Sequence, residues 1–205
     1  MERKILIVIG PQGSGNHVWS KILSLPENVY GWNHTDYWMA HKYEPFNEVW
    51  AEKKPLLFPE DYNYFVTSCS LPFVNNGKHV MPDVISFVRS CQANEVEPIV
   101  CTLTRDLSIL KSQQQRVRGE ETYKTALQEI KWLSTFFPIH FLSYESLILW
   151  KDVYLKYLSK LLEFPIDYGR LDEMNDILKI NSNEKYVQDP GPQLLDENVK
   201  HTYTL

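Results

Sequence analysis

The chain has 205 residues, of which 43% are hydrophobic and 23% are charged, so it suits one sizeable core and we expect a single domain over 1–205. This composition excludes the disordered and fibrous classes of protein. The formal net charge of -5 disfavours a protein that binds nucleic acid, because a phosphate backbone attracts clustered lysine and arginine side chains.

Strands and helices are expected to alternate along the chain. Residues 5–9 form a continuous apolar run, which is typical of a parallel strand covered on both faces. Helical spacing follows over 16–25 and ends at Pro26. The pattern then predicts strands at 28–32, 62–70, 97–105 and 139–144, and helices at 82–94, 106–118, 120–136, 145–163 and 170–180. This order predicts a three-layer α/β fold with a mainly parallel central sheet flanked by helices.

Two segments lack a clear period. Residues 33–62 are rich in tryptophan, tyrosine, histidine and proline, and we interpret them as an irregular, partly helical lid or substrate segment. Residues 181–205 have turn and loop chemistry and are expected to form an irregular C-terminal arm.

The cysteines and the hydropathy pattern bear on the compartment. Cys69, Cys91 and Cys101 have no metal-binding spacing, and their odd number does not indicate a disulfide framework. No apolar stretch is long enough to span a membrane, and the first apolar run leads into a glycine turn rather than a signal-peptide cleavage site. We therefore expect a cytoplasmic protein without a membrane partner.

The first strand and the first helix are joined by a glycine-rich loop, "GPQGSGNH", at 10–17. Gly13 and Gly15 allow the backbone to approach a ligand closely, and the start of a helix offers unpaired N–H groups to an anion. The loop therefore predicts a phosphate or sulfate site, in a fold of the P-loop type, built from Gly13, Ser14, Gly15, Asn16 and His17. The alternative is a glycine turn that only begins a helix.

This loop departs from the nucleotide-hydrolase pattern. Asn16 and His17 stand where that pattern has lysine followed by serine or threonine. No acid ends the strand at 62–70, so a conventional magnesium site is also missing from the sequence. Both observations disfavour a magnesium-dependent nucleotide reaction.

Three segments resemble the sulfotransferases that use 3'-phosphoadenosine 5'-phosphosulfate. They are "GPQGSGNHVW", "IVCTLTRDLSILKSQQQR" and "IHFLSYESL", and their order and spacing match the family over roughly 5–165. The resemblance implies that this nucleotide is the sulfuryl donor. It also implies a hydroxyl or amine acceptor on a small molecule or carbohydrate.

The resemblance also implies roles for individual residues. The loop corresponds to the site of the 5'-phosphosulfate. Arg105 and Ser112 correspond to the residues that hold the 3'-phosphate, although the usual spacing is one residue longer and would place Gln113 at the serine. Tyr144 and Glu145 correspond to a pair that supports the loop.

The chain departs from the family at Gly13, where members carry lysine or arginine. That cation stabilises the leaving phosphate oxygen. His17, Lys21 and Lys78 are the candidates to replace it, and the spacing does not select among them.

Resemblance to the carbohydrate-specific branch suggests His34 as the catalytic base, with Asp36 to orient or replace it. A histidine suits this task at neutral pH. The other family base is a histidine whose place is taken here by Ser70. Nearby aromatic residues are expected to form either a wall for the acceptor or part of the core: Trp32, Tyr37, Trp38 and Tyr43.

The leading hypothesis is a sulfotransferase-like enzyme. Two alternatives remain open at this point: a non-catalytic nucleotide-binding protein of the same fold, and a kinase with a degenerate P-loop.

Overall fold

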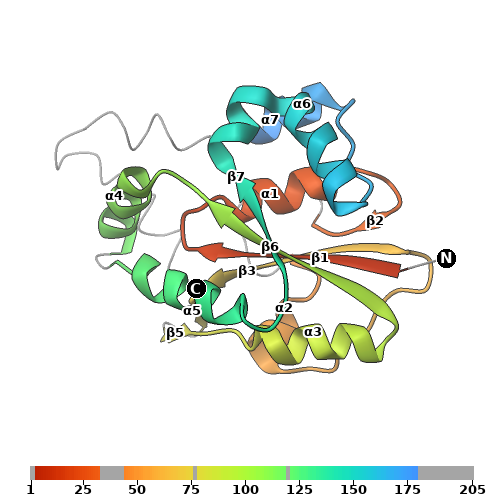
Figure 1. Ribbon diagram of the computed structural model, residues 1–205, viewed down its shortest axis with the longest axis horizontal. Helices are drawn as coiled ribbons and strands as arrows, with labels where there is room; N and C mark the ends of the chain where they lie inside the picture. The colour runs from red at the N-terminus through yellow and green to blue at the C-terminus, as the bar shows by residue number, and fades with distance from the viewer. Residues whose placement is uncertain (1–2, 33–43, 76–77, 119–120, 180–205) are drawn as a thin grey trace.

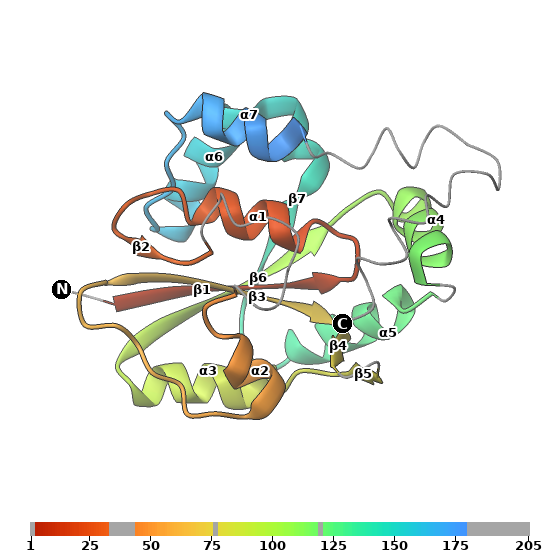
Figure 2. The same ribbon diagram turned by 180° about the vertical axis from the view of Figure 1, so that it is seen from behind.

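The computed structural model describes residues 3–32, 44–75, 78–118 and 121–179. It has an α/β fold in which a five-stranded parallel sheet is covered by helices on both faces (Figures 1 and 2). This confirms the predicted fold class. In spatial order the strands are β2 (Val29–Tyr30), β3 (Tyr64–Leu71), β1 (Arg3–Pro11), β6 (Val96–Thr104) and β7 (Ile139–Ser143).

Strand β1 lies at the centre of the sheet because it is apolar on both faces. Its residues from Ile5 to Ile9 are completely buried. Ile7 pairs with Thr67 of β3 on one side and with Val100 of β6 on the other. A central parallel strand has no face left for solvent, which explains the unbroken apolar run.

The helices divide between the two faces of the sheet, and each face has its own apolar cluster (Figures 1 and 2). Trp19 and Leu158 belong to one cluster, and Trp50 and Phe87 belong to the other. The first face carries α1 (Asn16–Leu23), α6 (Tyr144–Leu162) and α7 (Leu171–Lys179). The second carries α2 (Asn47–Glu52), α3 (Val84–Ala93) and α5 (Tyr123–Leu133). Helix α4 (Leu107–Arg118) lies beyond the carboxyl ends of the strands (Figures 1 and 2).

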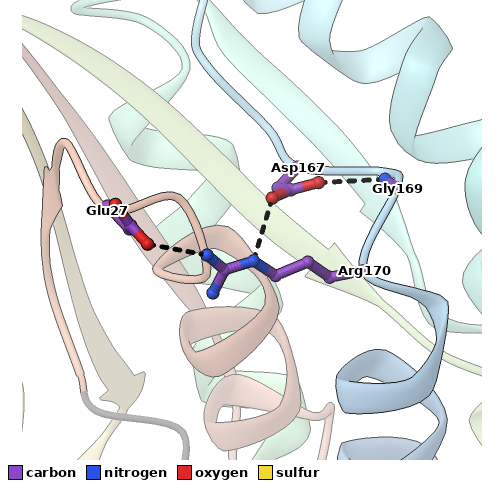
Figure 3. A network of polar contacts seen from close by, with 4 residues as sticks. All are labelled: Glu27, Asp167, Gly169 and Arg170. Atoms are coloured by element: carbon purple, nitrogen blue, oxygen red, sulfur yellow. Dashed lines mark hydrogen bonds and ion pairs between the residues drawn. The ribbon is translucent and has the colours of Figure 1, made fainter.

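A network of charged residues connects the segment after α1 with the start of α7 (Figure 3). Arg170 donates from Nη2 to Glu27 at 3.3 Å and from Nε to Asp167 at 3.2 Å. Asp167 also accepts a hydrogen bond of 2.9 Å from the backbone N–H of Gly169. The network therefore links the connection before β2 with the turn between α6 and α7.

The main strands and helices lie within a few residues of their predicted positions. The hairpin of β4 (Phe73–Asn75) and β5 (Lys78–Val80) was not predicted, because three-residue strands are too short to display an alternating pattern. The helix predicted at 145–163 contains a kink at Lys151, whose Nζ donates to Asn175 at 2.9 Å.

One predicted segment falls partly, and another entirely, outside the described residues. Of the irregular segment at 33–62, only 44–62 is described, and it contains α2. The C-terminal arm at 181–205 lies outside the description entirely. None of the described helices is both long enough and apolar enough to cross a membrane.

Candidate functional site

The glycine loop lies at the carboxyl edge of the sheet, between β1 and α1. After β1 the chain forms β2 and β3 on one side of that strand and later forms β6 and β7 on its other side. Helices α1 and α3 cover opposite faces of the sheet (Figure 1). Such a reversal opens a crevice where ligands bind in α/β sheets. The loop therefore stands at the position that this architecture offers to a ligand.

The loop conformation requires its glycines. Gly13 has φ +87° and Gly15 has φ +104°, both in the left-handed region. Buried Ser14 closes the turn, since its N–H and its hydroxyl both donate to the Pro11 carbonyl, at 3.1 and 2.6 Å. The hydroxyl of Ser14, a residue predicted to bind the anion, thus donates a hydrogen bond within the loop.

Helix α1 begins at the loop without a side-chain cap. Gly15 is its N-cap residue and makes no side-chain cap hydrogen bond. The first N–H groups of α1 and its dipole consequently favour an anion at this end. The ring of Tyr144 packs against Gly15, because a Cβ atom at position 15 would lie 2.7 Å from Cδ2 of that ring.

Arg105 extends from the end of β6 to the loop. Its Nη1 donates to the Gly13 carbonyl and, at 2.7 Å, to Oε1 of Gln113. Its Cζ lies 4.8 Å from the centroid of the Tyr144 ring. Segments after β1, β6 and β7 therefore meet around one guanidinium group.

The acids beside this group have structural roles. Glu145 accepts a hydrogen bond of 2.8 Å from the backbone N–H of Asp106. Asp106 accepts from the hydroxyl of Ser108 and from the N–H groups of Ser108 and Ile109, and so caps α4. These hydrogen bonds, the Ser108 hydroxyl first, lower the pKa of Asp106.

Two glutamines of α4 contact the groups around the loop, while the role predicted for Ser112 stays a prediction. Ser112 is exposed, while Gln113 receives the hydrogen bond of Arg105. Gln114 is buried and donates to the Gln12 carbonyl at 2.8 Å. The resemblance pointed to Gln113 only as a spacing alternative, and no motif pointed to Gln114.

The polar residues of α1 face β3 and Trp32. Buried Asn16 donates from Nδ2 to the Ser70 hydroxyl at 2.9 Å. The exposed ring of His17 lies 4.8 Å from Trp32, and Nζ of buried Lys21 lies 5.7 Å from the same ring. Two of the three candidate loop cations, His17 and Lys21, thus lie beside the same aromatic ring. The third, Lys78, is exposed on β5.

The predicted base and its neighbours are outside the described residues. These positions are His34, Asp36, Tyr37, Trp38 and Tyr43. Their roles remain predictions.

Sequence reasoning did not find Glu44, a buried acid beside β3. Its carboxylate accepts hydrogen bonds from the Thr67 hydroxyl at 2.7 Å and from the N–H groups of Ser68 and Phe46 at 3.2 and 3.0 Å. Burial outweighs these bonds and raises its pKa from 4.5 to about 7. A lone acid in an aromatic-rich segment gave no sequence signal for this environment.

Comparison with known protein families and with curated proteins found no match to this chain.

Proposed function

We propose that this chain is a sulfotransferase-like enzyme that binds 3'-phosphoadenosine 5'-phosphosulfate at the carboxyl edge of its sheet. The observation that carries the proposal is the meeting of three motif segments in one place. Arg105 contacts both Gly13 and Tyr144, although these residues belong to separate segments of the chain.

The residues of the loop suit the anionic end of such a donor. The uncapped start of α1 offers N–H groups to an anion, and the Tyr144 ring packs directly against Gly15 beside them. Arg105 brings a permanent positive charge to the loop. A phosphosulfate needs anion contacts of this kind and does not need magnesium.

In the proposed reaction the acceptor oxygen or nitrogen forms a bond to sulfur. The bond between sulfur and the bridging phosphate oxygen breaks, and adenosine 3',5'-bisphosphate leaves. His34 takes the proton of the acceptor, and Asp36 orients His34 or replaces it. The acceptor is a hydroxyl or amine compound, including a carbohydrate.

The degenerate-kinase alternative has less support. Asn16 and His17 stand where the nucleotide-hydrolase loop has lysine followed by serine or threonine. Asp106, the acid that follows β6 and Arg105, is engaged in capping α4. A magnesium-free donor fits these residues better.

Calorimetry with adenosine 3',5'-bisphosphate tests the cofactor assignment. We expect binding in the presence of a chelator and tighter than binding of ATP with magnesium. Gly15→Ala should weaken it, because a Cβ atom there meets the Tyr144 ring, whereas Gly169→Ala in an exposed turn should not. Tighter, magnesium-dependent binding of ATP would instead favour the kinase alternative.

The second candidate function is a non-catalytic nucleotide-binding protein, which Gly13 favours because it lacks the family's loop cation. Sulfuryl transfer to a panel of acceptors separates the two. For an enzyme, His34→Ala should lower kcat by about 100-fold or more with unchanged bisphosphate affinity, and His140→Gln should leave kcat unaltered. Binding without turnover on any acceptor would support the second candidate.

A further inference from the structure

We infer that Arg105 supplies the positive charge of the phosphate loop, in place of the lysine or arginine that Gly13 lacks, and that it acts on the 5' end of the nucleotide rather than on its 3'-phosphate. This inference rests on the proposed function and assigns the role of one residue within that site.

The placement of the guanidinium group is the first support. Nη1 of Arg105 is hydrogen-bonded to the backbone of Gly13 itself, so the charge lies against the loop and not at the exposed Ser112 expected to share the 3'-phosphate. An anion held by the N–H groups of the loop and α1 would therefore lie close to this positive charge.

The space around Gly13 is the second support. A Cβ atom at position 13 would lie 2.9 Å from both Cδ and Oε1 of Gln113, and the φ of +87° disfavours any side chain there. The amide of Gln113 therefore occupies the room that a loop side chain would need. The positive charge must reach the loop from another part of the chain, and Arg105, which follows β6, does so.

Gln113 acts as a positioning residue for Arg105. Its Oε1 accepts from Nη1 at 2.7 Å, while the Tyr144 ring lies 4.8 Å from Cζ. The guanidinium group is thus held between a carbonyl, an amide and an aromatic ring. A half-buried and restrained cation attracts an anion more strongly than one on a flexible exposed side chain.

The test compares adenosine 5'-phosphate with adenosine 3',5'-bisphosphate by calorimetry. If Arg105 acts on the 5' end, Arg105→Gln weakens both ligands by the same factor, about 10- to 100-fold for a charge-assisted hydrogen bond. Arg89→Gln, an exposed arginine on α3, is the matched control and should change neither affinity. Circular dichroism verifies that each variant is folded.

Three results would overturn the inference. The first is that Arg105→Gln weakens only the bisphosphate, which assigns Arg105 to the 3'-phosphate, and the second is that it weakens neither ligand. The third is that the unmodified chain binds the bisphosphate but not the monophosphate. In all three cases the proposed function stands. If the unmodified chain binds neither nucleotide, the proposed function fails as well.

A second set of variants addresses Gln113. Gln113→Leu should weaken both nucleotides about 3- to 10-fold, as expected for one hydrogen bond, and Gln115→Leu on the exposed side of α4 should not. The exchange Arg105→Gln with Gln113→Arg returns a guanidinium group to Gly13 and should recover part of the affinity lost in Arg105→Gln. Absence of both effects would remove Gln113 from the positioning role.

Discussion

Glu44 is a buried acid whose pKa the fold raises strongly. Strand β2 pairs with β3 at Tyr64 and Phe65, and Glu44 meets β3 farther along the same strand. The carboxylate of Glu44 accepts there from the Thr67 hydroxyl and the Ser68 N–H. The side chain of Glu44 therefore satisfies a hydroxyl and a backbone N–H of β3, at the cost of burying a carboxyl group.

Glu44 predicts that stability falls as pH rises. Its pKa is 4.5 in the unfolded chain and about 7 in the folded protein, so the folded state binds this proton more tightly. The resulting stabilisation is fully present below pH 4.5 and is lost as pH rises through about 7. We expect Glu44 to lower the free energy of unfolding by on the order of 3 kcal/mol between about pH 5 and about pH 8.

Urea denaturation of Glu44→Gln at the two pH values measures this effect. The variant should lose most of the pH dependence, because glutamine does not titrate in this range. Glu60→Gln, at an exposed position, should keep it. An equal pH dependence in Glu44→Gln and the unmodified chain would contradict the prediction.

At the scale of elements, α6 is apolar on two opposite sides. Leu155, Leu158 and Leu162 pack into the core beside the sheet. The opposite side exposes Val153, Tyr157 and Leu161, of which Leu161 is 46% exposed. Position on the helix, rather than residue type, should therefore decide what each leucine contributes.

Two leucines of α6 form a matched pair for testing this point. Leu158→Ala removes a fully buried side chain and should lower the free energy of unfolding by about 2–5 kcal/mol. Leu161→Ala should lower it by less than about 1 kcal/mol, because this side chain is already half in solvent. Thermal or urea unfolding of both variants measures the difference. Equal losses would mean that Leu161 is covered in solution.

At the scale of the whole molecule, Gln114 joins three elements around the site. Its Nε2 donates to the Gln12 carbonyl of the loop, and its Oε1 accepts from the N–H groups of Thr122 and Tyr123 at the start of α5. One buried amide thus links the first loop of the chain with two later helices. The loop geometry depends on this long-range junction as well as on its own glycines.

Gln114→Leu should loosen this junction. The substitution leaves the buried N–H groups of Thr122 and Tyr123 without their acceptor, which costs about 1–3 kcal/mol for each unsatisfied group. Hydrogen exchange should accelerate at these two amides, and Ser112→Ala, at an exposed position of the same helix, is the control. Unchanged exchange would show that the junction does not depend on the amide of Gln114.

The main elements could be predicted from the sequence because their burial imposes a local pattern. A strand covered on both faces must be continuously apolar, as at Ile5–Ile9, and a helix on the sheet must repeat its apolar residues every three or four positions. The glycine loop was also predictable, since Gly13 and Gly15 adopt backbone conformations that other residues rarely adopt. The chain order of these features determined the α/β class.

Only the tertiary structure decided which polar side chains share the site. Gly13, Arg105 and Tyr144 meet because β1, β6 and β7 are neighbours in the sheet, and Gln113 of α4 accepts a hydrogen bond from Arg105. The environment of Glu44 likewise depends on its long-range hydrogen bonds to Thr67 and Ser68 of β3. Hydrogen bonds form over a few ångström in space, and a local sequence pattern does not contain these distances.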